Sequence, residues 1–367
     1  MKKSFYLFIL IVFCAFILPF SANATNISAK GAVLIECDSG EIAYGKNEHI
    51  KMPMASTTKI MTALVVLENT DITDVVTIEP SMVGVEGSSI YLQIGEQLTV
   101  EALLYALLLE SANDAAVALA IHVANDIDSF AELMNAKAND LGLKNTHFTN
   151  PHGLDDSEHY TTAYELGTIA ANAMKNERFA EIVSTYKKVI PLNNGDGSRV
   201  LINHNKLLRS YDGALGVKTG FTKRCGRCLV SFAMRDNVKL ICVTLNAPND
   251  WQDHKALLDL GFSQYQNITL ATPNCYNVSL SAIGGEKDTF IAENDEGLSV
   301  TVRKDSCDIT AVLEANRLIS APIFKGDRVG RIVFYDRDKE IGVLPLYAKE
   351  NVPKLRYKKS IFERLFN

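Results

Sequence analysis

Residues Ser56 to Glu68 have the sequence STTKIMTALVVLE, and this stretch decides how the first part of the chain folds. Apolar side chains recur in it at helical intervals, and neither Gly nor Pro interrupts it, so the pattern predicts a helix. Ser56 and Lys59 would lie on the same face at its start. The unpaired N–H groups and the positive dipole end of a helix favour negative charge there. A carbonyl oxygen under attack by Ser56 would acquire such a charge.

The spacing of Ser56 and Lys59 suits a serine activated by a lysine. A serine hydroxyl is a poor nucleophile until a base removes its proton. Lysine, with an ordinary pKa of about 10.4, is protonated at neutral pH and cannot act as that base. Lowering its pKa to about 7.5 requires surroundings that favour the neutral amine over the ammonium form by roughly 4 kcal/mol. Partial burial and a second cation would both contribute, and Lys218 is the expected cation.

Two further tripeptides complete a possible acyl-transfer site: Ser111-Ala112-Asn113 and Lys218-Thr219-Gly220. Ser111 can pass a proton to a leaving amine, and Asn113 offers a donor and an acceptor to a substrate amide. Lys218 can also hold a substrate carboxylate, with the Thr219 hydroxyl beside it. Gly220 would let a substrate backbone approach the strand.

Each tripeptide or tetrapeptide alone is a weak signal, because the chain repeats two of them elsewhere. Ser184-Thr185-Tyr186-Lys187 is a second S-x-x-K, and Ser21-Ala22-Asn23 repeats the middle tripeptide. Neither repeat has the same sequence context. The ordered set of three, with one member opening an apolar helix and another in a strand-like run, is specific.

The ordered set is the signature of penicillin-binding proteins and class A β-lactamases. From about Ala32 to Phe262 the chain resembles the serine D-Ala-D-Ala carboxypeptidases, the low-molecular-mass penicillin-binding proteins. The resemblance is carried by PMASTTKIMTAL (53–64), GSSIYLQIGEQLTVEALLYALLLESANDAA (87–116), NPHGLDDSEHYTTAYELG (150–167), NHNKLL (203–208) and GALGVKTGFTKRCGRCLVSFAMRD (213–236).

This resemblance implies an exported enzyme that removes the terminal D-Ala from peptidoglycan pentapeptides ending in D-Ala-D-Ala, with β-lactam antibiotics as covalent inhibitors and no cofactor. It implies Ser56 as the acylated nucleophile and Lys59 as its base. The other residues that it places in the cleft are Ser111, Asn113, Lys218 and Thr219. Backbone N–H groups of Ser56 and Phe221 would form the oxyanion hole.

The sequence departs from the family pattern at Ala112, where Gly is usual, and at Cys225 and Arg227, where Ala and Tyr are expected. The change at Ala112 looks harmless, whereas Cys225 and Arg227 would change the rim of the cleft and with it the substrate preference. Two other functions share the motifs. A β-lactamase needs efficient deacylation, and no E-x-x-L-N word of class A enzymes lies between Asn113 and Lys218. An inert peptidoglycan-binding protein would have no chemical reason to keep all the polar residues of the cleft.

The N-terminus predicts export. Lys2 and Lys3 precede an apolar run from Phe5 to Phe20, followed by Ala22-Asn23-Ala24. This pattern is typical of a signal peptide cleaved after Ala24. The run is also long enough to be a marginal membrane anchor.

Six cysteines remain after that cleavage, too few for a densely cross-linked scaffold of this size. Cys225 and Cys228 form C-x-x-C. This pattern fits two buried thiols without a function, and the alternatives are a redox pair and half of a metal site. The histidines lack the spacing of metal ligands, so we expect no metal.

The alternation of elements predicts an α/β (α+β) domain of residues 25–266, in which strands at both ends form one antiparallel sheet on a helical region. Strands are expected at 31–36, 41–44, 215–219, 227–234 and 239–245. Helices are expected at 56–68, 100–109, 113–125, 129–141 and 163–174. The three motifs would meet where helices and sheet join.

Short strand-like runs separated by turns predict a small all-β domain at 267–350. Its expected strands are 278–283, 298–303, 309–313, 329–335 and 339–345. In the resembled family such a domain lifts the peptidase from the membrane; a passive packing role fits the sequence equally well.

Residues 351–367 carry five basic residues against one acidic residue, whereas the chain from residue 25 onward has 35 basic and 43 acidic residues. Ile361, Phe362, Leu365 and Phe366 would share one helical face. This favours a short amphipathic segment on the outer face of an anionic cytoplasmic membrane, with a solvated tail as the alternative. The acidic balance and the lack of a second basic patch argue against nucleic-acid binding.

Overall fold

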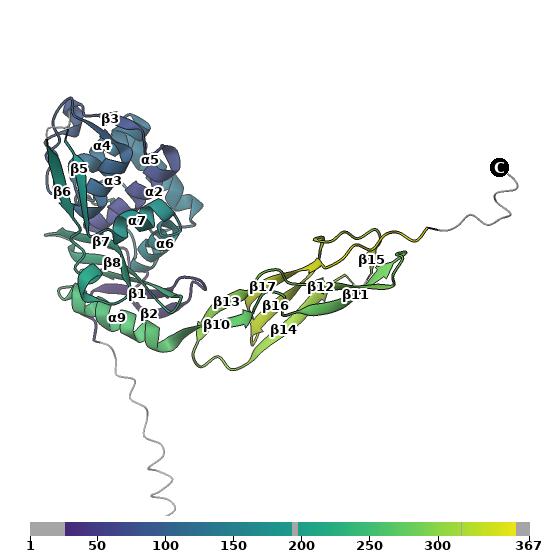
Figure 1. Cartoon of the computed structure of the whole chain (residues 1–367). Coiled ribbons are helices and arrows are strands. Elements are labelled where there is room, and N and C mark those ends of the chain that lie inside the picture. The colour runs from purple at the N-terminus through teal and green to yellow at the C-terminus, as the bar shows by residue number, and fades with distance from the viewer. Residues whose placement is uncertain (1–25, 193–196, 317, 357–367) are drawn as a thin grey trace, which may run out of the picture.

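The structure is a computed structural model that describes residues 26–192, 197–316 and 318–356. It has two units, one of mixed helices and strands and one elongated and all-β (Figure 1). The predicted signal peptide lies outside the described residues, as does the basic tail beyond Arg356. Within the described part of the chain, no helix has the length and apolar character needed to cross a membrane.

A five-stranded antiparallel sheet organises the first unit, with the strand order β2-β1-β9-β8-β7. Its strands are β1 (Gly31–Glu36), β2 (Ile42–Lys46), β7 (Ala214–Thr222), β8 (Gly226–Arg235) and β9 (Val238–Leu245). The first strand pairs with the last along its whole length, from Gly31 opposite Leu245 to Glu36 opposite Leu240. The prediction that strands from both ends of the domain share one antiparallel sheet is therefore confirmed.

Both faces of this sheet are covered, and alternate residues of β1 point to opposite faces. Val33 and Ile35 belong to the core shared with the helical region. Ala32 and Leu34 pack in a second core with helix α9 (Asp250–Gln264). Successive side chains of a strand point to opposite faces, so a wholly apolar strand fits between two layers.

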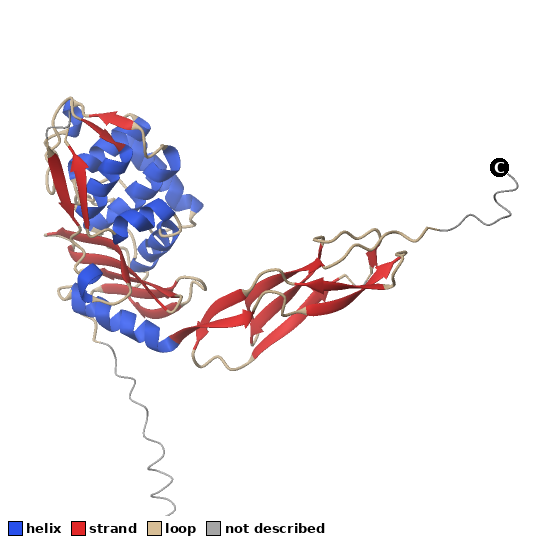
Figure 2. Ribbon diagram, viewed as in Figure 1, coloured by secondary structure: helices blue, strands red, loops and turns tan. Residues whose placement is uncertain are grey.

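The helical region lies on the opposite face of the sheet from α9 (Figure 2). It contains α2 (Lys59–Asn69), α3 (Val100–Leu109), α4 (Asn113–Ala124), α5 (Ile127–Asp140), α6 (Ala163–Ala173), α7 (Glu177–Ser184), the short α8 (Leu207–Ser210) and the 3-10 turns η1 (Ala55–Thr58) and η2 (Pro80–Met82). Two hairpins flank it: β3 (Val75–Thr77) with β4 (Gln97–Thr99), and β5 (Lys187–Pro191) with β6 (Ser198–Ile202).

Two details of the helix prediction were wrong. The stretch Ser56–Glu68 is not one α-helix, because its first turn is the 3-10 turn η1 and α2 begins at Lys59. Helices α7, α8 and α9 were not predicted. Helix α9 has polar side chains on its buried face, so its sequence lacks the apolar pattern that would indicate a buried helix. One of these side chains, His254, lies between Ser231 Oγ and Thr244 Oγ1, at 2.7 and 2.9 Å. Burial lowers the pKa of His254 to about 3, so it packs as a neutral ring.

The second unit is all-β, as predicted. Strands β10 (Tyr265–Ala271) and β13 (Leu298–Arg303) form one antiparallel pair. A larger sheet has the order β14-β16-β17-β12-β11-β15. Its strands are β11 (Asn277–Ile283), β12 (Thr289–Glu293), β14 (Ile309–Ala315), β15 (Ile319–Ser320), β16 (Arg328–Asp336) and β17 (Lys339–Ala348). The prediction missed β10, β12 and β15.

The two units join through β10, which follows α9 without a linker. Polar contacts bridge them: Arg303 Nη1 lies 2.9 Å from Glu41 Oε1, and the Thr301 hydroxyl donates to Asp38 at 3.3 Å. Beyond this junction the β unit extends away from the helical region, and the last described residues lie at its far tip (Figure 1).

Candidate active site

Ser56 lies in the 3-10 turn η1, at the edge where the helical region meets strand β7. The residue before it, Ala55, has a left-handed backbone with φ of 49°, which is unfavourable for a residue with a Cβ and indicates an imposed turn. The Thr58 hydroxyl donates to the Ala55 carbonyl at 2.8 Å, and His159 Nε2 lies 2.8 Å from the same hydroxyl. These contacts hold the backbone that carries Ser56.

The tautomer of His159 follows from its partners. Its Nδ1 accepts from the backbone N–H of Thr149 at 3.1 Å, so the ring proton is on Nε2 and is donated to Thr58. Burial lowers the pKa of His159 to about 4, which keeps the ring neutral. His159 thus supports the turn without carrying charge into the site.

Lys59 is fully buried at the start of α2, with its side chain directed at three oxygens. Nζ lies 2.6 Å from Oδ1 of Asn113, 2.7 Å from the His152 carbonyl and 3.1 Å from Ser56 Oγ. A neutral amine has two N–H donors and one lone pair. The two carbonyl oxygens can only accept, so a neutral Lys59 gives both N–H groups to them. Its lone pair then remains for the Ser56 hydroxyl.

The electrostatics favour that neutral form. Burial, followed by repulsion from Lys218, holds the pKa of Lys59 well below its ordinary value, and Asp114 acts weakly in the other direction. Lys218 on β7 is also buried, and burial lowers its pKa to about 7. Its Nζ donates to the Thr219 carbonyl at 2.9 Å. Two desolvated lysines in one site cannot both keep an ordinary pKa.

Asn113, the first residue of α4, is held from several sides. Its Oδ1 accepts from Lys59, its Nδ2 donates to the Glu86 carbonyl at 2.5 Å, and its backbone N–H donates to the Ser88 carbonyl at 2.7 Å. A Cβ at Gly87, which has φ of 94°, would lie 2.7 Å from Asn113 Nδ2. One N–H of this amide remains without a partner among the described residues, whereas its acceptor, which the sequence suggested for a substrate, is taken by Lys59.

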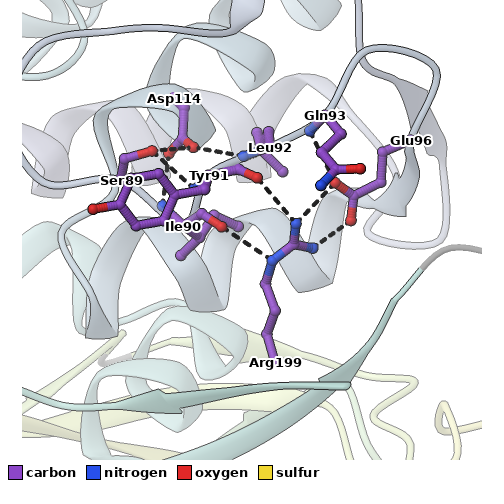
Figure 3. A network of polar contacts seen from close by, with 8 residues as sticks. All are labelled: Ser89, Ile90, Tyr91, Leu92, Gln93, Glu96, Asp114 and Arg199. Atoms are coloured by element: carbon purple, nitrogen blue, oxygen red, sulfur yellow. Dashed lines mark hydrogen bonds and ion pairs between the residues drawn. The ribbon is translucent and has the colours of Figure 1, made fainter. Parts of the chain in front are cut away.

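The loop that holds Asn113 is itself fixed by a polar network (Figure 3). Asp114 accepts from the Ser89 hydroxyl at 2.6 Å and from the backbone N–H groups of Ile90 and Leu92. Arg199 on β6 donates to the Ile90 carbonyl at 3.1 Å and binds the carboxylate of Glu96. This network ties residues 86–96 to both α4 and the β5–β6 hairpin.

A cleft of about 350 Å³ opens above Ser56. Five residues expected from the sequence line it: Ser56, Ser111, Thr219, Gly220 and Phe221. Ser111 has φ of 61° and, within the described residues, its hydroxyl has no hydrogen-bond partner. The other lining residues are Ser88, His204, Lys206, Arg227, Asp250 and Trp251. All three sequence motifs therefore meet at one place, with Lys59, Asn113 and Lys218 buried beside the cleft.

Gly220 is needed for a reason that differs from the one expected. A Cβ at this position would lie 3.1 Å from the backbone nitrogens of both Ser56 and Thr57. Gly220 therefore lets strand β7 approach the turn η1, and any room it leaves for a substrate is a further effect.

At the cleft rim, Arg227 is held by a carboxylate that the sequence analysis did not identify. Its Nε and Nη2 lie 3.0 and 2.9 Å from the two oxygens of Asp250, whose side chain is 3% exposed. The guanidinium also lies 5.8 Å from the centre of the Trp251 ring. Asp250 and Trp251 open α9, so this helix places them on the rim.

Asp155 links two parts of the site. Its Oδ1 accepts from the Thr222 hydroxyl at 2.9 Å and from the Cys225 thiol at 3.2 Å. Thr222 and Cys225 belong to the turn between β7 and β8, whereas Asp155 lies in the same loop as His152, the partner of Lys59. Cys225 and Cys228 are both free thiols, and burial raises the pKa of Cys225 to about 11 and of Cys228 to about 12.

The second S-x-x-K is not at a site of this kind. The Ser184 hydroxyl donates to the Glu181 carbonyl at 3.0 Å at the end of α7, and Lys187 is exposed on β5. Ser21 lies outside the described residues. Within the ranges that the structure describes, no three His, Cys, Asp or Glu side chains are grouped to hold a metal ion.

Comparisons with known proteins agree with this geometry. Residues 19–249 match the family described as D-alanyl-D-alanine carboxypeptidase, and residues 265–354 match the C-terminal domain of penicillin-binding protein 5. The D-alanyl-D-alanine carboxypeptidase DacF of Bacillus subtilis is 34% identical over 336 residues, which cover 89% of this chain and 86% of the relative.

Two solved structures are similar over most of their length. Penicillin-binding protein 5 of Haemophilus influenzae gives a TM-score of 0.70 at 29% identity, covering 90% of this chain and 98% of the other. The peptidoglycan synthesis regulatory factor PBP3 of Streptococcus pneumoniae gives 0.76 at 25% identity, covering 89% and 100%. With its motifs in one cleft and both domains matched, the chain belongs to the D-alanyl-D-alanine carboxypeptidase family of serine peptidases, among the penicillin-binding proteins.

Proposed function

We propose that this D-Ala-D-Ala carboxypeptidase works through an acyl-enzyme on Ser56. The observation that carries the proposal is the set of contacts of Lys59: two carbonyl acceptors take its N–H groups, and the Ser56 hydroxyl lies 3.1 Å from its remaining lone pair. Burial and Lys218 favour the neutral amine that this role needs. A base within hydrogen-bond reach of a hydroxyl is the general requirement for activating a serine.

In this mechanism Ser56 Oγ attacks the carbonyl carbon of the last peptide bond while its proton passes to Lys59 Nζ. Backbone N–H groups of Ser56 and Phe221 stabilise the negative charge on the carbonyl oxygen. The C–N bond then breaks, the amine takes a proton through Ser111, and D-Ala leaves. Water hydrolyses the ester and frees Ser56. Lys218 and Thr219 hold the substrate carboxylate, and Asn113 positions Lys59.

Penicillins are expected to acylate the same serine. Attack opens the strained β-lactam ring, and the amine that would leave stays tethered to the acyl group. Slow hydrolysis of that ester distinguishes a penicillin-binding carboxypeptidase from a β-lactamase.

We also propose that the chain is exported by residues 1–24 and attaches to the membrane surface through the basic tail 351–367. The supporting observation is that the described part of the chain ends at the tip of the β domain, which points away from the unit that contains strand β7 (Figure 1). The membrane attachment therefore leaves the cleft free to face the cell wall.

The test is intact-protein mass spectrometry of residues 25–367 after exposure to benzylpenicillin, alongside release of D-Ala from a peptide ending in D-Ala-D-Ala. We expect one lasting adduct in the wild type and in Ser184→Ala, and none in Ser56→Ala. An adduct that persists in Ser56→Ala would overturn the assignment of the nucleophile. Penicillin consumed without a lasting adduct would favour a β-lactamase, and intact penicillin with no D-Ala release would favour an inert binding protein.

A further inference from the structure

The far tip of the β domain exposes large apolar side chains in a small area. Four residues there are strongly exposed: Ile283 at 44%, Leu318 at 70%, Phe324 at 59% and Leu355 at 45%. In the rest of this domain, as far as the structure describes it, only Val312 and Leu313 on β14 are large hydrophobic residues with comparable exposure. Single exposed apolar residues are ordinary, whereas a cluster at one end of a domain indicates an interaction surface.

The four residues come from three segments that the backbone holds together. Strand β15 pairs with the end of β11 at Ile283, and Ile323 forms a bridge with Val352. The backbone N–H of Leu355 donates to the Gly284 carbonyl at 2.8 Å. We define the distal tip as residues 283–286, 318–325 and 351–356.

The charges of the distal tip favour an anionic partner. Lys325, Lys354 and Arg356 form no ion pair with any described residue of the chain. The Asp327 carboxylate beside them accepts from the Phe324 backbone N–H at 2.8 Å. Glu350 is already paired with Lys287, whereas Asp327 keeps its charge; within the residues of the distal tip, Glu286 is the one acid against these three basic residues.

The path of the chain identifies the partner. At Arg356 the polypeptide leaves this tip and continues into a sequence with Lys358, Lys359, Ile361 and Phe362. The tip therefore lies where the proposed membrane tail begins. A bilayer interface accepts protruding apolar residues without a matching shape, provided that basic groups meet its headgroups.

We propose that the distal tip is a second membrane contact, in which Leu318 and Phe324 enter the interface of an anionic bilayer beside Leu355, at the start of the basic tail. This inference rests on the proposed membrane attachment and deepens it. The two strands β16 and β17 have nine and ten residues, so at ~3.3 Å per residue the domain would separate its two ends by roughly 30 Å. Two contacts would fix the direction of this spacer, which a single contact through the tail would not do.

The experiment measures partition of the protein onto vesicles of phosphatidylglycerol and phosphatidylethanolamine by flotation. Four proteins are compared: residues 25–367, the double variant Leu318→Ser/Phe324→Ser, the matched control Val312→Ser on the middle of β14, and a variant lacking residues 357–367. We expect the double variant to bind about tenfold more weakly, because it lacks two large apolar side chains that would be partly buried in the bilayer interface. The control should bind as the wild type.

A second measurement detects insertion directly. Phe324→Trp should show a blue-shifted fluorescence difference spectrum on addition of vesicles and quenching by brominated lipid, whereas Val312→Trp should show neither. Trp251, the single natural tryptophan, provides the background in both. D-Ala release by every variant reports that the enzyme domain is folded.

The outcomes separate this inference from the proposals above. If removal of 357–367 abolishes binding while the double variant binds as the wild type, the tail anchors and the tip inference is wrong. If the wild type ignores vesicles but releases D-Ala, both membrane proposals are wrong and the catalytic one stands. If the double variant changes only self-association in sedimentation, the tip contacts a second copy and the membrane inference is again wrong.

Discussion

Nζ of Lys59 lies 2.6 Å from Oδ1 of Asn113, closer than to Ser56 Oγ at 3.1 Å. Asn113 holds the lysine through an uncharged acceptor. A neutral amide can accept one N–H of the amine without favouring its protonation as strongly as a carboxylate would. The identity of residue 113 should therefore set the pKa of the base.

Asn113→Asp tests this relationship. The new carboxylate would stabilise the ammonium form and raise the pKa of Lys59, so less neutral lysine is present at a given pH. Each unit of increase should lower acylation about tenfold at any pH below the original pKa, and by less between the original and the new pKa. Measured against pH, the rate of acylation by benzylpenicillin should have its acidic limb moved to higher pH.

Asn139→Asp makes the same charge change on an exposed position of α5 and should leave the profile in place. If Asn113→Asp lowers the rate equally at every pH, Asn113 positions the substrate and does not tune the base.

Lys218 gives a pH-dependent prediction about stability. Burial lowers its pKa from 10.5 to about 7, so between these values the unfolded chain binds a proton that the folded chain does not. Stability therefore rises with pH across this window, and the full cost of burying the charge applies below about pH 7. Lys218→Met removes that cost.

We expect Lys218→Met to be more stable than the wild type, by up to ~3 kcal/mol near pH 6, with a margin that shrinks as the pH rises toward 10.5. Its acylation rate should fall, because the site loses its cation. Urea unfolding at several pH values measures the margin, with the exposed Lys206→Met as control. A margin that is constant or grows with pH would contradict the assignment.

The sequence predicted the elements whose apolar pattern is local. Strand β1 and helix α3 were found with their observed bounds, because each is an almost unbroken run of buried apolar residues. Helix α9 was missed because it is anchored by Asp250, Asp253 and His254, which are buried against partners far along the chain. Spacing in one sequence does not reveal such partners.

The site shows the same division. Ser56 and Lys59 are three residues apart and could be paired from spacing alone. The contacts of Arg227 with Asp250 and of Asp155 with Cys225 join residues 23 and 70 positions apart. They depend on how the sheet, α9 and the loop at 150–159 meet, so only the structure could supply them.

Asp155 should affect catalysis without touching the substrate. Asp155→Ala removes the acceptor of Thr222 and Cys225 and frees the loop that carries His152 from the β7–β8 turn. Without these hydrogen bonds the loop should hold Lys59 less precisely and slow acylation about tenfold, whereas the melting temperature should change little because the residue is exposed.

Asp155→Asn keeps one acceptor oxygen and should restore most of the rate. The neighbouring Asp156→Ala is the control, since Asp156 contacts only its own loop. Equal rates for all three variants would show that the Asp155 contacts do not position the site.

Arg227 and Asp250 form a pair whose two members should be replaced together. Arg227→Ala leaves the buried Asp250 carboxylate without its partner, which should destabilise the protein by ~1–3 kcal/mol, less than for a fully buried pair because Arg227 is partly exposed. Asp250→Asn on its own should cost less, since an amide needs no counter-ion. In Arg227→Ala/Asp250→Asn, which combines the same two changes, the stability should recover, because no unpaired charge remains. The rim of the cleft would still differ, so the KM for a peptide ending in D-Ala-D-Ala should change while acylation of Ser56 by penicillin stays measurable.

Unfolding free energies of the single and double variants give the coupling between the two residues. Additive effects would show that the carboxylate does not depend on Arg227, and that the pair contributes nothing to holding α9 against the rim.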